Sequence, residues 1–170
     1  MIKFRELGMF ATAKNDPTIQ AHAAIANGYL CTIAAGKTVA LPDDATAKVA
    51  ELKLALLHHD ADEVYPAAIA ADAYVTAFDV ASWAGQHLIV DSTHVKLADG
   101  TAAFADLEVG DIFVACDATT SPADAGKFLE IAAAAGYNIW FSLEAEVKLN
   151  GVAAIDLLVH VASAATVVAG

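Results

Sequence analysis

Positive charge is scarce in this sequence. Lys and Arg together number 9 against 21 Asp and Glu, so the formal net charge is −12 at pH 7. Proteins that bind DNA or RNA neutralise phosphates with Lys and Arg, which acidic residues here outnumber more than two to one. The composition therefore argues against nucleic acid as the main partner, and we expect no nucleic-acid partner.

Cysteine, targeting sequence and long apolar runs are also lacking. Cys31 and Cys116 are too few for a disulfide framework. The N-terminal Met-Ile-Lys-Phe-Arg-Glu has no apolar core behind its charges, so no signal peptide is predicted. The longest uncharged stretch, residues 17–36, contains His22 and Asn27 and is too polar to cross a bilayer. We expect synthesis in a reducing cytoplasm and no membrane partner.

Small apolar residues are abundant instead. Hydrophobic residues make up 58% of the chain and aromatic residues 8%, and about a quarter of all residues are alanine. This apolar content excludes intrinsic disorder. In an acidic protein it predicts that apolar surface is covered between subunits, in a homo-oligomer that we expect to be a trimer or a dimer. The alternative is that alanine raises the hydropathy while burying little area.

Short apolar runs separated by turn residues dominate the chain from Gly28 onward. Residues 29–33 and 38–41 flank Ala-Gly-Lys and predict a hairpin. Asp99-Gly100 is a second hairpin signal. Further strands are expected at 74–78, 87–90, 93–97, 112–115 and 152–161.

This rhythm predicts a mainly β fold, a single β-barrel or sandwich-like domain with room for one short helix. The domain is expected to span residues 1–170, with an N-terminal arm at 1–27 and an apolar C-terminal tail at 163–170. Two segments are ambiguous. Residues 49–57 fit a helical face but also alternate as a strand, which we favour because both neighbours are predicted strands.

The second ambiguous segment, residues 121–136, keeps two interpretations open. Ser121-Pro122-Ala123-Asp124 is the best helix-start signal in the chain, because Ser caps, Pro suits the first helical position and Asp suits the first turn. The competing interpretation is a strand over 127–132 that pairs, after a turn near Gly136, with a strand over 138–147.

Histidines and acidic residues cluster in places that suggest metal binding. Adjacent residues of His58-His59-Asp60-Ala61-Asp62-Glu63 do not converge on one point, so a solvated turn is predicted and no metal site. His87, His94 and His160 lie in or beside apolar runs. Each is expected to be a hydrogen-bonded histidine of the barrel, with a pH sensor at a subunit boundary as the alternative.

Catalytic and cofactor motifs are not found. The sequence contains no G-x-S-x-G, P-loop or G-x-G-x-x-G pattern. Cys31 and Cys116 lie in apolar strand segments, where cysteine behaves as a small hydrophobic residue. We therefore predict no catalytic residue and no cofactor, and expect that the protein is not an enzyme. Trp83 and Trp140 are predicted core or interface anchors.

The C-terminal tail has no charged side chain after Asp156. A terminus exposed to water is normally polar, so this apolar end is expected to be buried. Residues up to Val161 are predicted to complete the domain's own sheet. Thr166, Val167 and Val168 are candidate interface residues that would add a strand to a neighbouring subunit, and the alternative is a frayed end.

Several turn-and-strand motifs follow one another along most of the chain. They are Met9-Phe10-Ala11-Thr12-Ala13-Lys14-Asn15, Asn27-Gly28-Tyr29-Leu30, Phe78-Asp79-Val80-Ala81-Ser82-Trp83-Ala84-Gly85-Gln86, Phe104-Ala105-Asp106-Leu107-Glu108-Val109-Gly110-Asp111, Gly126-Lys127-Phe128-Leu129 and Ile139-Trp140-Phe141. Their order resembles that in the small β-rich head proteins of tailed bacteriophages, the decoration or cement proteins encoded near the major capsid protein. The Ala-rich stretches 43–57 and 121–136 depart from the family pattern.

The resemblance implies a mechanical function. Such proteins bind the outer face of an assembled capsid and stabilise it against the pressure of packaged DNA, so the implied partner is the major capsid protein and the implied location is the virion surface. Two alternatives are another virion part, such as a tail tube, adaptor or fibre-base subunit, and a small ligand-binding β-barrel or enzyme. A polar pocket around His58, His59 or His94 would favour the last.

Overall fold

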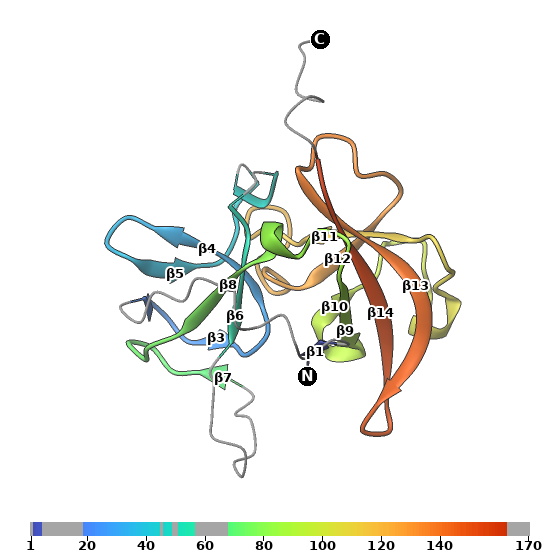
Figure 1. The fold of residues 1–170 in the computed structure, drawn as a ribbon, viewed down its shortest axis with the longest axis horizontal. Helices are drawn as coiled ribbons and strands as arrows, with labels where there is room; N and C mark the ends of the chain where they lie inside the picture. The colour runs from blue at the N-terminus through green and yellow to red at the C-terminus, as the bar shows by residue number, and fades with distance from the viewer. Residues whose placement is uncertain (1, 5–18, 45, 49–50, 57–67, 163–170) are drawn as a thin grey trace.

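The chain folds into three β-sheets of seven, five and two strands in the computed structural model (Figure 1). The structure describes residues 2–4, 19–44, 46–48, 51–56 and 68–162. These residues contain short 3-10 helices but no α-helix. The prediction of a mainly β, barrel or sandwich-like fold is therefore confirmed.

The seven-stranded sheet runs in the order β1, β9, β14, β13, β11, β12, β10. Its strands are β1 (Ile2–Phe4), β9 (His87–Asp91), β14 (Val152–Val161), β13 (Ile139–Leu149), β11 (Ile112–Ala115), β12 (Phe128–Ile131) and β10 (Val95–Lys96). All neighbours in it are antiparallel except β10 and β12. The sheet curls into a half-barrel dominated by the long β13–β14 hairpin (Figure 1).

The two smaller sheets form the other half of the molecule. The five-stranded sheet runs β2 (Gln20–Ala21), β5 (Thr38–Ala40), β4 (Leu30–Ala34), β6 (Lys53–Leu56), β8 (Thr76–Asp79), and the two-stranded sheet pairs β3 (Ile25–Ala26) with β7 (Ala68–Ile69). The 3-10 helices are η2 (Thr46–Lys48), η3 (Val80–Trp83), η4 (Ser92–His94) and η5 (Phe104–Asp106).

Strands β4, β6 and β8 form a layer that is buried on both faces. Leu30, Leu54 and Phe78 lie opposite one another across these strands and face the larger hydrophobic core. Their chain neighbours point the other way, into a smaller core: Cys31, Ala55 and Ala77. The middle layer therefore supplies side chains to both cores, and each core is closed on its far side by a different sheet.

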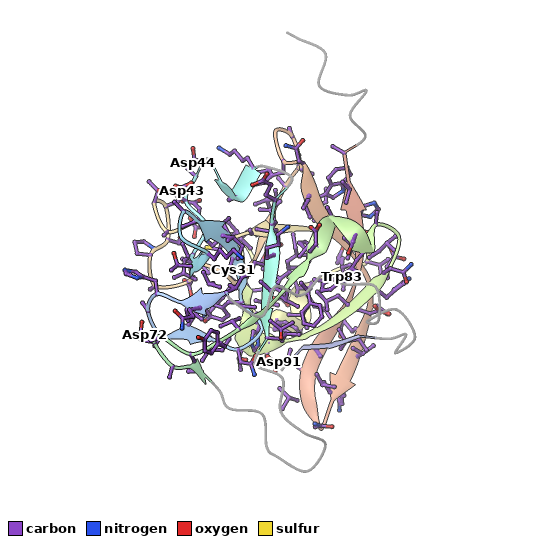
Figure 2. The ribbon with its side chains drawn as sticks, turned by 60° about the vertical axis from the view of Figure 1, so that its left-hand side comes forward. Cys31, Asp43, Asp44, Asp72, Trp83 and Asp91 are labelled. Atoms are coloured by element: carbon purple, nitrogen blue, oxygen red, sulfur yellow. The ribbon has the colours of Figure 1, made fainter. Side chains whose placement is uncertain are left out.

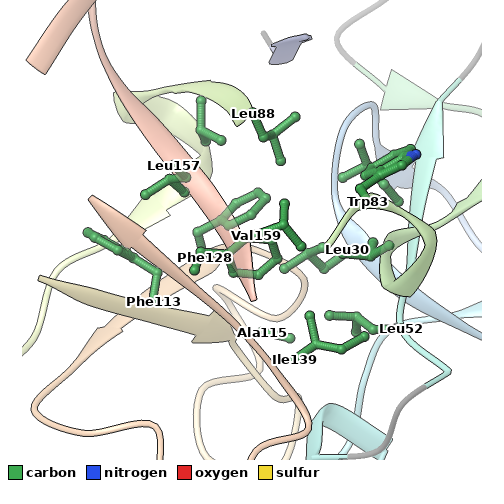
Figure 3. Close-up of a cluster of buried hydrophobic side chains, with 14 of the residues drawn as sticks. Leu30, Leu52, Trp83, Leu88, Phe113, Ala115, Phe128, Ile139, Leu157 and Val159 are labelled. Carbon is green, nitrogen blue, oxygen red and sulfur yellow. The ribbon is translucent and has the colours of Figure 1, made fainter. Parts of the chain in front are cut away.

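The larger core fills the space between the half-barrel and this middle layer. Alternate residues of β13 point into it, namely Ile139, Phe141 and Leu143, all completely buried. The rings of Phe128 and Phe141 meet edge to face, with centroids 4.9 Å apart. Figure 3 shows Leu30, Leu52 and Trp83 packed beside the half-barrel residues Leu88, Phe113, Phe128, Leu157 and Val159.

Most predicted strands are present. β4 and β5 form the predicted hairpin around Ala35–Lys37, and β14 has the predicted bounds 152–161. β6 confirms the strand interpretation of the first ambiguous segment. The second ambiguous segment also forms a strand, β12, preceded by turns. The pairing predicted for it with the 138–147 strand is wrong, because β11 lies between β12 and β13 and pairs with both.

The residues around the helix-start signal at Ser121 do not form a helix, because backbone groups on both sides of Ser121 make other hydrogen bonds. The Asp117 carboxylate accepts the amides of Thr119 and Thr120 at 2.9 and 2.7 Å. Gly126 then donates to the Cys116 carbonyl at 2.9 Å, so the segment closes as a compact loop before β12. A helix begun at Ser121 would need the Gly126 amide for a hydrogen bond to the Pro122 carbonyl.

The hairpin predicted at Asp99-Gly100 is wrong. A turn does form there, with Thr101 donating to the Ala98 carbonyl at 3.0 Å, but the chain does not return alongside β10. Instead β10 pairs in parallel with β12. The Glu130 carboxylate of β12 accepts the Ala98 amide at 3.0 Å and the Thr101 hydroxyl at 2.7 Å, and so ties the turn to that strand.

The predicted arm and tail are described only in part. β1 pairs with β9 at one edge of the half-barrel, and β2 and β3 belong to the smaller sheets. Residues 5–18 and the tail 163–170 lie outside the described residues. The single-domain organisation stays a prediction.

Gly126 forms a close backbone contact between the two halves of the molecule. Its carbonyl accepts the Leu30 amide at 2.7 Å, and its φ of +87° falls in the left-handed region that favours glycine. A Cβ at this position would lie 2.9 Å from the Leu30 carbonyl oxygen and 2.9 Å from the Tyr29 ring. Only glycine fits this contact between the 116–127 loop and β4.

We predict that Gly126→Ala lowers the free energy of unfolding by about 3 kcal/mol, because strain at positive φ adds to a backbone clash. Gly136→Ala is the matched control: Gly136 has the same φ of +87° but nothing within 4 Å of its Cβ position. It should cost only about 1 kcal/mol. Urea denaturation of both variants measures the difference, and equal losses would contradict the close approach.

Candidate interaction surface

Both thiols are buried, which agrees with their apolar sequence context. Burial raises the pKa of Cys31 to about 12, and the nearby Lys53 ammonium opposes this only in part. Burial also raises the pKa of Cys116, with the Asp124 and Asp117 carboxylates acting in the same direction. A nucleophilic cysteine needs a lowered pKa and access to solvent, so neither thiol is suited to catalysis. Figure 2 shows Cys31 in the interior of the smaller half.

We predict that neither Cys31 nor Cys116 reacts with Ellman's reagent in the native protein at about pH 8, because thiol reactivity follows thiolate character and access. Both should react fully in denaturing urea. Ala153→Cys is a positive control, since Ala153 is exposed on β14. Rapid native labelling of either natural thiol, at a rate near that of the control, would contradict the assignment.

A buried polar cluster joins the end of β9 to the smaller half of the molecule. His94 on η4 has Nδ1 2.9 Å from Asp91 Oδ1 and Nε2 2.8 Å from the Asn27 carbonyl oxygen. The Thr93 hydroxyl contacts both Asp91 Oδ1, at 2.5 Å, and His94 Nδ1, at 3.0 Å. The Tyr29 ring meets the imidazole edge to face, with centroids 5.7 Å apart.

Burial determines the charge of the His94 ring in this cluster. Burial lowers the pKa of His94 to about 4, because the interior disfavours a charged ring. The hydrogen bond to the Asn27 carbonyl acts in the opposite direction but only in part offsets burial. Both ring nitrogens are engaged by oxygen atoms of the protein, which makes the cluster a structural link.

We predict that His94→Leu destabilises the protein by about 3 kcal/mol, because Asp91 and the Asn27 carbonyl lose a buried partner. His22→Leu is the control, since His22 is exposed, and it should change stability by less than about 0.5 kcal/mol. Urea denaturation followed by tryptophan fluorescence measures both. A loss in His94→Leu as small as that of the control would rule out the structural link.

The outward face of the β13–β14 hairpin carries a mixed aromatic and polar group. Trp140 and His160 lie directly opposite each other and stack, with ring centroids 5.3 Å apart and 5° between the planes. His160 Nε2 is 2.8 Å from the Ser142 hydroxyl, which donates to Glu144 Oε1 at 3.1 Å. Leu158 lies opposite Ser142. We call Trp140, Ser142, Leu158 and His160 the Trp140 patch.

The Trp140 patch is a surface feature built on rigid support. Its residues alternate with the inward-pointing Ile139, Phe141, Leu157 and Val159, so they face away from the larger core, and all are half-buried. The ring of Trp140 is held against His160 rather than free to rotate. A partly apolar face on a packed sheet is suited to contact with another macromolecule.

The order of the polar groups in this patch does not suit nucleophilic catalysis. In a serine-hydrolase triad, histidine lies between serine and the carboxylate and takes the serine proton. Here Ser142 lies between His160 and Glu144, so the carboxylate contacts the serine and not the histidine. The arrangement therefore lacks the carboxylate-held histidine of such a triad. The expectation that the protein is not an enzyme stays a prediction.

His87 is the remaining histidine of the half-barrel predicted to be hydrogen-bonded. Its Nδ1 lies 3.0 Å from Oδ1 of the buried Asp156, one strand away. The three histidines His87, His94 and His160 are thus all held by protein oxygens, as their apolar context predicts. Asp156 lies beside the bulge of β13, where the register with β14 shifts between Leu143 and Ala145.

The structure separates the candidate interface residues. Trp140 lies on the surface, whereas Trp83 is buried against Phe78 with ring centroids 5.8 Å apart. Trp83 therefore anchors the core, which is the first of its two predicted roles. Thr166, Val167 and Val168 lie outside the described residues, as does the cluster from His58 to Glu63.

The described part of the chain shows neither a metal cluster nor a membrane-spanning helix. No group of three or more His, Cys, Asp or Glu side chains is placed to hold a metal ion there. In the same part, no helix has both the length and the hydropathy needed to cross a membrane. Comparisons of the chain with protein-family models, with curated proteins and with solved structures found no match.

Proposed function

We propose that the protein is a bacteriophage virion structural protein, a capsid decoration or cement protein that binds the outer face of the assembled shell and stabilises it. The order of its turn-and-strand motifs supports this proposal, as the resemblance to phage head proteins covers most of the chain. Its partners would be the major capsid protein and further copies of itself. It would be made in the host cytoplasm and act on the virion surface.

The observation that carries the proposal is the Trp140 patch. A stacked tryptophan and histidine with an adjacent leucine gives aromatic and apolar contact area on an outward sheet face. Aromatic side chains dominate the binding energy of protein interfaces, and a residue held in place loses little entropy on binding. Since the Glu144 carboxylate contacts Ser142 and not His160, the patch lacks the order of a catalytic triad and is better suited to adhesion than to chemistry.

The charge of the chain is compatible with this function. A net charge of −12 keeps free copies soluble before they find the shell. Cement proteins need only modest affinity for each contact, because binding to the assembled state alone stabilises it by mass action and many copies act together. An acidic protein also does not compete for the packaged DNA.

We predict that Trp140→Ala weakens binding to undecorated capsids at least about tenfold, as expected for a central aromatic interface residue. The capsids are those of the virus whose genome encodes the chain, assembled without it, and binding is measured by co-sedimentation. Tyr74→Ala is the control, because Tyr74 is 63% exposed in the smaller half of the molecule, away from the Trp140 patch. Its binding should match that of the wild type.

Wild-type protein that does not bind these capsids would overturn the proposal. Rings or stacked discs of purified protein would favour a tail-tube or adaptor subunit instead. Electron cryo-microscopy of decorated particles then places the Trp140 patch. If the Trp140 patch of the bound protein faces solvent, the patch is not the capsid interface, although the proposed function stands.

A further inference from the structure

The tip of the β13–β14 hairpin extends beyond the rest of its sheet (Figure 1). β9 pairs with β14 only over Ala154–Leu158, and β11 pairs with β13 only at Phe141 and Ser142. From residue 144 onward, β14 is the only described strand that pairs with β13. Residues 144–149 therefore form an unpaired strand edge within the described structure, which we call the β13 edge.

The turn determines which backbone groups the β13 edge presents. Asn150 and Gly151, with φ of 51° and 83°, form a two-residue loop that closes on the hydrogen-bonded pair Leu149 and Val152. Because bonded and non-bonded positions alternate along an antiparallel pair, Val147 also bonds to β14. The N–H and C=O groups of Glu146 and Lys148 therefore point outward.

The bulge at residue 144 creates this arrangement. Before it, Leu143 points its backbone groups toward β11, donating to the Asp111 carbonyl at 2.9 Å and accepting from the Gly110 amide at 2.8 Å. The bulge then shifts the register between Leu143 and Ala145. Before the bulge, Leu143 presents its backbone N–H and C=O groups away from β14. After the bulge, Glu146 and Lys148 do so.

We propose that the β13 edge pairs antiparallel with the β13 edge of a second copy of this chain, about a two-fold axis through Val147. In this register Glu146 lies opposite the second copy's Lys148, and Lys148 lies opposite the second copy's Glu146. Both positions present outward backbone groups, so each pair exchanges its N–H and C=O hydrogen bonds. Cross-strand pairs of opposite charge stabilise the same arrangement.

Charge selects this register over its neighbours. Moving the two-fold axis to Glu146 would place Glu146 against itself, and moving it to Lys148 would place Lys148 against itself. Like charges directly opposite each other destabilise a strand pair. A shift of one residue would set charged side chains on the face of the half-buried Ala145 and Val147. Only the axis through Val147 pairs both charges and keeps the apolar residues together.

A second copy is favoured as the occupant because the edge is self-complementary. Exposed edges with charge of one sign repel copies of themselves, which is how proteins prevent edge pairing. Here Glu146 and Lys148, both exposed and two residues apart, carry opposite signs in an otherwise acidic chain. Two-fold pairing of one edge also closes the assembly at a dimer instead of extending it. This interface does not depend on the proposed function.

Sedimentation velocity over a concentration series tests the interface with the full chain. We expect the wild type to pass from the 17.5 kDa monomer to a dimer as concentration rises. Lys148→Glu should weaken the dimer at least about tenfold, because both ion pairs become repulsions. Glu146→Lys should do the same. The double variant with Glu146→Lys and Lys148→Glu restores opposite charges and should return to within about threefold of the wild type.

Amide hydrogen exchange tests the strand pairing itself, because a change in net charge alone would not alter the protection of individual amides. The amides of Glu146 and Lys148 should become protected as the dimer forms, while that of Val147, already bonded to β14, should change little. Glu51→Lys is the charge control, since Glu51 is exposed in the smaller half of the molecule. Circular dichroism confirms that each variant is folded.

Three results would overturn the proposal. The first is a wild-type monomer up to about 1 mM, a concentration at which even weak specific interfaces form. The second is an oligomer whose mass is unchanged in Lys148→Glu, which would place the interface elsewhere. The third is a double variant as weak as the single ones, which would mean that Glu146 and Lys148 do not face each other.

Discussion

The burial of one sheet on both of its faces is the constraint on which the rest of the fold depends. Leu30, Leu54 and Phe78 line up across β4, β6 and β8 and close the core of the half-barrel. Their chain neighbours Cys31, Ala55 and Ala77 point to the opposite face and close the smaller core. Neither the half-barrel nor the two-stranded sheet could bury its apolar face without this shared layer.

The shared layer also explains which elements sequence patterns predict well. β13 and β4–β5 follow ordinary strand and turn rules, because alternation or a glycine turn marks them. β6 was harder, since Leu54 and Ala55 are both fully buried and the strand lacks clear alternation. For residues 121–127 the sequence left helix and strand as alternatives. The residue that decides between them, Asp117, precedes the helix-start signal, and its carboxylate accepts the amides of Thr119 and Thr120.

The candidate surface was accessible to sequence reasoning only in part. Trp140 could be singled out because tryptophan in an alternating strand is a recognised anchor. Its stacking partner His160 depends on the register of β13 and β14, which is set by the turn at Asn150 and the bulge near Glu144. A hairpin turn such as Asn-Gly can be recognised in a sequence, but a bulge has no comparable local signal. The pairing of His94 with Asn27 joins distant segments and had no sequence signal at all.

The bulge in β13 has a consequence for how this hairpin can change in length. Residues on the core side of the bulge alternate in one phase, and residues on the turn side alternate in the other. Loss of Glu144, the extra residue of the bulge, would leave Leu143 opposite Leu157 and Ala145 opposite Asp156 in an unbroken register. Loss of Ser142 would instead turn Phe141 or Leu143 out of the core. The bulge is therefore a position where this hairpin can lose a single residue without reversing the faces of its neighbours, so a related chain that is one residue shorter in β13 should lack the residue at position 144.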